Sequence, residues 1–221
     1  SIFDSSGNTV HYIGKFWSRM NLALTGVRVN IAGLENIQPG KPYIVMSNHQ
    51  SHYDVWTLIG HMPLQLRWVM KKELRAIPIF GYGCGRMGHI YIDRRNPGQS
   101  HHELEVVREK FSAGSSVVFF PEGTRSPDGN LLPFKKGGFV MSILYGVPIL
   151  PVTIRGTREV LSKGSFMPMP GRIDVIIHPP VSPEEYDMTT KESLMERVRE
   201  IILSAKRQPP SAGSALRPYF T

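Results

Sequence analysis

Only one cysteine, Cys84, occurs in the 221 residues, and no uninterrupted apolar run reaches 18 residues. A single cysteine excludes an internal disulfide framework and is typical of a reducing compartment. The longest nearly apolar stretch, Phe139 to Ile154, contains two prolines and is too short to span a bilayer. No signal peptide is recognisable.

Several patterns of catalysis and ligand binding are also missing. There is no Gly-x-Ser-x-Gly nucleophile elbow and no phosphate-binding P-loop, and the histidines lack the spacing of a zinc site. We therefore expect no metal. Gly83-x-Gly85-x-x-Gly88 has the letters of a dinucleotide fingerprint, but a Pro-broken segment precedes it and a strand pattern follows it. Cys84 has no obvious base beside it, so we do not expect it to be a nucleophile.

Acidic residues are fewer than basic ones. The chain has 26 Lys and Arg against 18 Asp and Glu, a formal net charge of +8. This balance favours anionic partners, among them phosphates, anionic lipid surfaces and nucleic acid. No nucleic-acid-binding motif accompanies the charge, so we do not expect a nucleic acid partner. The length and the 41% hydrophobic content are sufficient for one sizeable core.

Strand-like and helix-like patterns alternate along the chain. This alternation predicts a single α/β domain with a largely parallel central sheet flanked by helices. We expect an N-terminal amphipathic segment over residues 1–30, the α/β domain over 31–207, and a flexible Pro/Ser/Gly-rich tail over 208–221. The expected strands are 43–46, 66–70, 90–92, 116–120, 147–154 and 173–178, and the expected helices are 51–61, 96–111, 138–145 and 189–206.

Residues Tyr12 to Val27 have the pattern of an amphipathic helix. Its apolar face would comprise Ile13, Trp17, Met20 and Leu24, with Lys15 and Arg19 elsewhere. Two interpretations remain open: the apolar face packs on the core, or the helix lies on a membrane surface. The apolar, Pro-broken segment Ile77 to Tyr82 allows the same two interpretations.

The heptapeptide Asn48-His49-Gln50-Ser51-His52-Tyr53-Asp54 joins an apolar strand pattern to an apolar helix pattern. Within one helix, residues five apart differ by about 140° and about 7.5 Å in rise, so His49 and Asp54 would not meet. They meet only if His49 lies in the loop and Asp54 in the first turn, as the helix-start signal Ser51-x-x-Asp54 predicts. Asp54 can then orient the imidazole and stabilise its protonated form. A helix cap beside an ordinary loop histidine is the alternative.

Basic side chains follow three of the expected strands. Phe120-Pro121-Glu122-Gly123-Thr124-Arg125-Ser126 offers a guanidinium suited to a phosphate, and Gly123 permits a tight turn. Arg94 and Lys71 each follow another strand. Because ligands bind at the carboxyl ends of parallel strands, these side chains are candidates for one phosphate site. Solvated ion pairs are the alternative. Two interpretations of Lys135-Lys136 remain open: phosphate binding or a basic turn.

Four segments, in this order, resemble motifs of the glycerolipid acyltransferases, specifically the 1-acyl-glycerol-3-phosphate acyltransferases. They are Asn48-His49-x-x-x-x-Asp54, Gly88-His89-Ile90-Tyr91-Ile92-Asp93-Arg94, Phe120 to Ser126, and Val147-Pro148-Ile149-Leu150-Pro151-Val152. The resemblance extends from about Lys41 to Ile154 and identifies residues 31–207 as an acyltransferase domain.

The resemblance implies a reaction. The hydroxyl of lysophosphatidic acid attacks an acyl thioester carried by coenzyme A or acyl carrier protein, and phosphatidic acid forms. His49 is the implied general base and Asp54 its support. The implied substrate-binding residues are Asn48, Lys71, Arg94, Glu122, Gly123, Thr124 and Arg125. An activated thioester needs no protein nucleophile, and no cofactor is expected beyond the acyl-CoA or acyl-ACP co-substrate.

The resemblance also implies a membrane-associated enzyme on the cytoplasmic face, which is the inner membrane in a bacterium. One alternative is an acyltransferase with another acceptor, such as glycerol 3-phosphate or another lysophospholipid. Asp93-Arg94 favours the lysophosphatidic acid branch, by resemblance only. A different alternative is a non-catalytic protein that binds anionic membranes, against which the intact His49 and Asp54 argue.

Overall fold

The computed structural model describes residues 7–92, 100–207 and 217–218. Its strands are β1 (Val27–Ala32), β2 (Ile44–Ser47), β3 (Leu66–Lys71), β4 (Ile90–Ile92), β5 (Ser116–Phe119), β6 (Ile149–Arg155), β7 (Gly171–Ile177) and β8 (Arg217–Pro218). Its helices are α1 (Asn8–Leu24), α2 (Tyr53–His61), α3 (Phe80–Arg86), α4 (Ser100–Ser112), α5 (Gly137–Tyr145), α6 (Thr157–Val160) and α7 (Lys191–Arg207), with short 3₁₀ helices η1 (Leu34–Asn36) and η2 (Lys72–Ala76).

The described strands form one sheet in the order β4-β3-β5-β2-β6-β7-β1-β8. From β4 to β6 all neighbours are parallel, so the carboxyl ends of these strands meet at one edge. β7 is antiparallel to β6 and parallel to β1, which pairs antiparallel with β8. The predicted α/β fold with a largely parallel sheet is confirmed.

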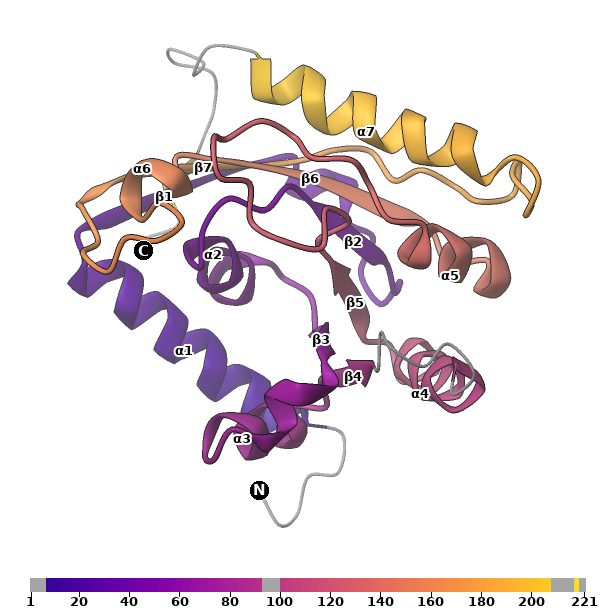
Figure 1. The fold of residues 1–221 in the computed structure, drawn as a ribbon, viewed down its shortest axis with the longest axis horizontal. Coiled ribbons are helices and arrows are strands. Elements are labelled where there is room, and N and C mark those ends of the chain that lie inside the picture. The colour runs from indigo at the N-terminus through magenta and orange to yellow at the C-terminus, as the bar shows by residue number, and fades with distance from the viewer. Residues whose placement is uncertain (1–6, 93–99, 208–216, 219–221) are drawn as a thin grey trace.

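Helices cover both faces of the sheet (Figure 1). One hydrophobic core combines buried residues of α1 and α2 with one face of the strands, and a second combines α4, α5 and α7 with the other. The strand period of two explains this division, because successive side chains point to opposite faces. Val45 of β2 lies in the first core, and its neighbours Ile44 and Met46 lie in the second.

The expected elements are largely present, with boundary shifts of one to three residues in most cases. The strand at 90–92 has the predicted bounds. The expected helix start at 96–97 lies outside the described residues. On α7 the buried stripe consists of Leu194, Val198, Ile202 and Ala205.

The expectation that the first helix extends to Val27 is wrong. The helix ends at Leu24, Gly26 adopts a φ of +70°, and residues 27–32 form β1. Val27, Val29 and Ile31 are buried in alternation, a period-two pattern that belongs to a strand. Within the predicted tail, Arg217 and Pro218 pair with β1.

Candidate active site

The two segments expected to form the site leave adjacent parallel strands. β2 leads into His49 and β5 leads into Glu122, and Met46 of β2 pairs with Phe119 of β5. Backbone hydrogen bonds continue beyond the strands, because the Ser126 N–H donates to the carbonyl of His49 at 2.8 Å. The two loops are therefore joined at the carboxyl edge of the sheet.

His49 and Asp54 are in direct contact. The Nδ1 atom of His49 lies 2.8 Å from Oδ2 of Asp54, with His49 in the loop and Asp54 in the first turn of α2, as predicted. The same carboxylate oxygen accepts the backbone N–H groups of Gln50 and Ser51 at 2.7 and 2.8 Å. Asp54 is fully buried, so these three donors hold it in one position.

The His49 ring is held on its other sides as well. It stacks on Phe120 with ring centroids 3.9 Å apart and an interplanar angle of 12°. Its side chain remains 15% exposed, whereas that of Asp54 is inaccessible. A carboxylate at Nδ1 requires the proton on that nitrogen, which leaves the lone pair of Nε2 as the acceptor. The pair therefore presents a fixed base.

Glu122 binds backbone on both of its oxygens. Oε1 accepts the N–H of His49 at 2.7 Å and Oε2 accepts the N–H of Leu132 at 2.8 Å. Burial raises the pKa of Glu122, and these two N–H groups, together with the charges of Lys206 and His49, oppose the rise. Glu122 is 4% exposed, and its two oxygens hold the backbone of His49 and Leu132. Its assignment to substrate binding stays a prediction.

Asn48 connects β2 to β6. Its Nδ2 donates to the carbonyl of Ile154 and its Oδ1 accepts the N–H of Ile154, both at 2.8 Å. The side chain is fully buried. Both polar atoms of the Asn48 amide are thus bonded to the backbone of a neighbouring strand. Substrate binding by Asn48 stays a prediction.

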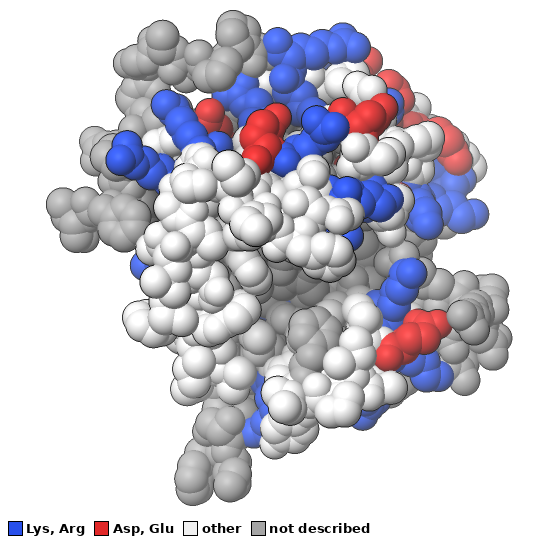
Figure 2. Space-filling model, turned by 60° about the vertical axis from the view of Figure 1, so that its left-hand side comes forward, with Lys and Arg blue, Asp and Glu red and all other residues white. Residues whose placement is uncertain are grey.

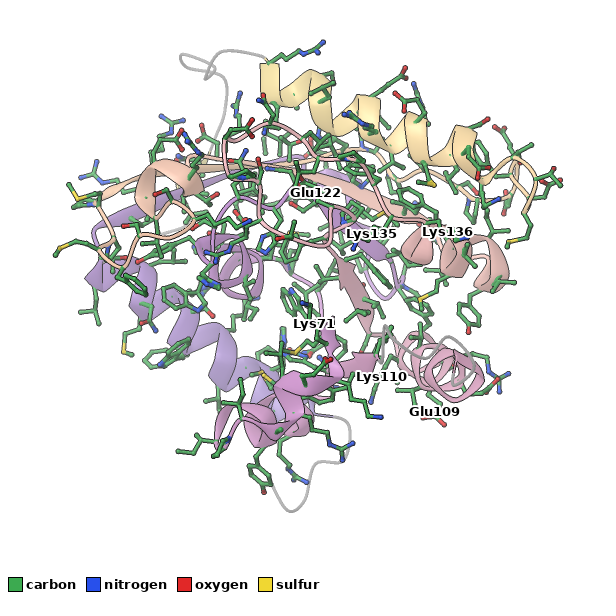
Figure 3. All side chains as sticks on the ribbon, in the orientation of Figure 1. Lys71, Glu109, Lys110, Glu122, Lys135 and Lys136 are labelled. Carbon is green, nitrogen blue, oxygen red and sulfur yellow. The ribbon has the colours of Figure 1, made fainter. Side chains whose placement is uncertain are left out.

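The remaining candidates are distributed around this edge. Gly123 has a φ of +72°, and a Cβ there would lie 2.8 Å from Cε of Lys135, so the turn accommodates no side chain without a shift. Thr124 is exposed. Lys71 is exposed at the end of β3, which pairs with β5 through Trp68 and Val118. Figure 3 labels Glu122, Lys135 and Lys71 in this region. Arg94 lies outside the described residues.

Arg125 lies close enough to the loop of His49 and His52 to affect the pKa of His52. Desolvation lowers the pKa of His52, and the positive charges of Arg125 and His49 lower it further. Arg125 is half-buried, and its carbonyl accepts Nζ of Lys163 at 3.0 Å. The site thus combines an oriented imidazole with a guanidinium nearby. Among residues 7–92, 100–207 and 217–218, no group of three His, Cys, Asp or Glu side chains is placed to hold a metal ion.

Residues 28–155 match the sequence model of the family described as Acyltransferase. The chain belongs to the acyltransferase family. One relative within this family is a chloroplastic 1-acyl-sn-glycerol-3-phosphate acyltransferase of Brassica napus, 35% identical over 185 residues, which are 83% of this chain and 53% of the plant protein. Another is the 1-acyl-sn-glycerol-3-phosphate acyltransferase alpha of Mus musculus, 33% identical over 86% of this chain and 67% of the mouse protein.

A solved acyltransferase structure has the same fold. The 1-acyl-sn-glycerophosphate (LPA) acyltransferase PlsC from Thermotoga maritima aligns with a TM-score of 0.77 and 29% identity, covering 91% of this chain and 81% of that one. The chain spans about half the length of the Brassica relative. The family match ends at residue 155, so α6, β7 and α7 lie beyond it.

Proposed function

We propose that this protein transfers an acyl group from an acyl thioester to the free hydroxyl of lysophosphatidic acid and forms phosphatidic acid. The observation that carries the proposal is the 2.8 Å contact between His49 and Asp54 beside the loop of Arg125. The names of the relatives from Brassica napus, Mus musculus and Thermotoga maritima support the same reaction class.

The proposed reaction begins at Nε2 of His49. This nitrogen takes the proton of the acceptor hydroxyl while the oxygen attacks the thioester carbonyl, a general-base step worth about 10²–10⁴-fold. The tetrahedral intermediate collapses with cleavage of the C–S bond. The departing thiolate then takes the proton from the imidazolium, so a free thiol leaves and His49 is restored. Asp54 stabilises the imidazolium between the two transfers.

Arg125 is the proposed anchor of the acceptor phosphate, with Lys71 and Arg94 as further cations. Holding the phosphate places the hydroxyl beside His49, and such positioning contributes a large part of many rate enhancements. The acyl donor is the thioester of coenzyme A or of acyl carrier protein. No cofactor enters this scheme, because the thioester is already activated.

Replacing Arg125 by alanine is expected to raise the KM for lysophosphatidic acid by about 10- to 100-fold, since each charge-assisted hydrogen bond contributes about 1.5–3 kcal/mol. Steady-state kinetics with a varied acceptor concentration measure this change. Arg28→Ala is the matched control, because Arg28 is an exposed cation on β1. An unchanged KM for Arg125→Ala would remove Arg125 from the phosphate site.

One assay compares the candidate acceptors and donors. Purified protein is supplied with acyl-CoA or acyl-ACP and with lysophosphatidic acid, glycerol 3-phosphate or another lysophospholipid, and release of free thiol is followed. The proposal expects the highest kcat/KM with lysophosphatidic acid. Faster turnover of glycerol 3-phosphate would favour that acceptor, and no thiol release with any pair would favour a non-catalytic membrane-binding protein.

The proposed partner of α1 is a membrane surface. Its large apolar side chains face solvent rather than the core: Tyr12 62%, Ile13 63%, Phe16 71%, Trp17 48%, Met20 39% and Leu24 78% exposed. Its basic side chains turn inward instead. Nζ of Lys15 donates to the carbonyl of Met62 at 3.0 Å, and Nε of Arg19 donates to the carbonyl of Gly60 at 2.7 Å. The apolar face of α1 is therefore exposed to solvent and is not buried in the core.

A second apolar segment continues this surface. The connection between α6 and β7 exposes Phe166 by 98%, Met167 by 74% and Met169 by 58%, and its Pro170 lies against Gly26 just beyond α1. Figure 2 shows a broad surface without charged residues on this side of the molecule, bordered above by basic side chains with acidic ones among them. An apolar surface with basic side chains at its border suits an anionic lipid surface, where each Lys or Arg adds about 1 kcal/mol.

The apolar segment Ile77 to Tyr82, which leads into α3, contributes in the same way. Ile77 is 45% exposed, Ile79 89% and Tyr82 74%, so a core location is excluded for these three side chains. None of the described helices is long and apolar enough to cross a bilayer. We propose attachment to one face of the membrane, the cytoplasmic face, which in a bacterium is that of the inner membrane.

Replacing both Phe16 and Trp17 by serine is expected to weaken binding to anionic phospholipid vesicles by at least about tenfold, since burying one such side chain contributes about 1.5–3 kcal/mol. Co-sedimentation with the vesicles measures the partition. The control is Leu144→Ser, which removes a 53% exposed side chain from α5, on the other face of the sheet. Equal binding of the double variant and the wild type would contradict the membrane role of α1.

A further inference from the structure

The loop that carries Glu122 and Arg125 is bound by cations from beyond the family match. Residues 121–132, which we name the Gly129 loop, present carbonyls to four basic side chains. Nζ of Lys206 donates to the carbonyl of Gly129. The other pairs are Lys163 with Arg125 at 3.0 Å, Arg158 with Pro127 at 3.5 Å and Arg199 with Leu131 at 3.4 Å.

Among these four, Lys206 is the cation with a second link to the active site. Lys206 is half-buried near the end of α7, and the carbonyl it binds also accepts Nε2 of Gln50 at 2.9 Å. Gln50 in turn donates its backbone N–H to Asp54 at 2.7 Å. One carbonyl of the Gly129 loop is thus shared by α7 and by the segment that supports His49.

We propose that Lys206 is a positioning residue for acyl transfer: from α7 it holds the Gly129 loop so that Glu122 keeps the backbone of His49 in place. The inference rests on the proposed function for its activity readout. Its structural basis is the bond of Lys206 to Gly129, the loop backbone that joins Gly129 to Glu122, and the N–H of His49, which donates to Oε1 of Glu122 at 2.7 Å. The N–H of Gly129 also donates to Oγ of Ser126 at 3.0 Å, and the N–H of Ser126 donates to the carbonyl of His49 at 2.8 Å.

The charges around Lys206 favour this role. Four carboxylates act on it, Glu122, Asp128, Asp54 and Glu159, and they oppose the lowering of the pKa of Lys206 that burial causes. The groups acting on Glu122 are Lys206 from α7, His49 after β2 and the N–H groups of His49 and Leu132. Lys135 lies beside the adjacent Gly123. Lys206 therefore supplies positive charge to a site that holds several buried or partly buried acids.

Removal of the Lys206 charge changes the pKa of Glu122 in one direction. Without Lys206, the pKa of Glu122 rises further above its ordinary value, because one of the influences that oppose burial is removed. A protonated Glu122 turns one acceptor oxygen into a donor that faces an N–H group, so it loses a bond to His49 or Leu132. As the pH is lowered, a variant without the Lys206 charge therefore loses the Glu122 carboxylate at a higher pH than the wild type does. Activity that depends on this carboxylate is lost with it.

The test compares Lys206→Met with Lys206→Arg and with the control Arg207→Met, which removes the neighbouring exposed cation. We expect Lys206→Met to lower kcat by about 10- to 100-fold, as for a misplaced catalytic group, with little change in the KM for lysophosphatidic acid. We expect the acid limb of the plot of kcat against pH to move to higher pH. Lys206→Arg should restore both, and Arg207→Met should change neither.

Plots of kcat against pH that coincide for Lys206→Met and Arg207→Met would overturn the proposal. A loss of kcat that is equal at every pH, with no movement of the acid limb, would overturn it too. If Lys206→Met does not fold, Lys206→Gln, which keeps a polar end without the charge, is judged by the same two outcomes. Amide hydrogen exchange gives a readout that needs no turnover. Residues 121–132 should exchange faster in Lys206→Met than in Arg207→Met, even if the wild type proves inactive toward lysophosphatidic acid; equal exchange would also overturn the proposal.

Discussion

Replacement of His49 by alanine is expected to abolish acyl transfer, with kcat reduced by at least about 10²–10⁴-fold. In the proposed mechanism the hydroxyl of the acceptor must lose its proton as it attacks, and Nε2 of His49 is the atom that takes it. The ring is held by Asp54 at 2.8 Å and by stacking on Phe120. Among the described residues of the loop between β2 and α2, His49 is the side chain that is both bonded to Asp54 and stacked on Phe120.

Thiol release from acyl-CoA in the presence of lysophosphatidic acid measures the turnover of His49→Ala. His52→Ala is the matched control, because His52 is an exposed histidine of the same loop and is expected to retain most of the turnover. The thermal unfolding midpoint of His49→Ala should fall only moderately, because Asp54 loses one donor but keeps the N–H groups of Gln50 and Ser51. Near-normal turnover of a folded His49→Ala protein would reject the general-base mechanism.

Replacement of Asp54 by asparagine is expected to lower kcat by about 10²–10⁴-fold, by analogy with other His/Asp pairs. The amide oxygen of asparagine can still accept the N–H groups of Gln50 and Ser51, but it carries no charge to stabilise the imidazolium. Asp54→Ala removes the acceptor altogether and should additionally destabilise the fold by about 1–3 kcal/mol, because two buried N–H groups lose their partner.

Kinetics and thermal unfolding of the two Asp54 variants separate catalysis from loop structure. Asp187→Asn is the control, because Asp187 also accepts backbone N–H groups before a helix, those of Thr189 and Thr190, but has no contact with His49. We expect Asp187→Asn to keep its kcat. If Asp54→Asn also keeps a wild-type kcat, Asp54 is a helix-start residue without influence on the reaction.

The local geometry of the His49–Asp54 pair was predictable because it depends on neighbours in sequence. Ser51-x-x-Asp54 before an apolar run predicts a helix start, and the helix start decides that residues five apart can meet. For Glu122 and Arg125 the sequence predicted only that they lie at the same edge of the sheet as this pair, because parallel strands bring their carboxyl ends to one edge. Alternation of strand and helix patterns predicted that edge.

The roles of Asn48 and Glu122 were not predictable in the same way. Asn48 binds a residue 106 positions away and Glu122 binds one 73 positions away. Local periodicity carries no information about such partners. A polar side chain at a strand end has the same local pattern whichever partner it finds, so only the tertiary structure shows these backbone partners.

The sequence by itself determined most of the elements, the class of sheet and the pairing of His49 with Asp54, because propensity, periodicity and helix-start chemistry act over a few residues. The tertiary structure alone decided which way α1 faces. Its Lys15 and Arg19 bind carbonyls at the end of α2, so the apolar stripe remains outside. The tertiary structure also decided that Lys206 reaches Gly129, 77 residues away, because the packing of α7 against the sheet is a long-range event.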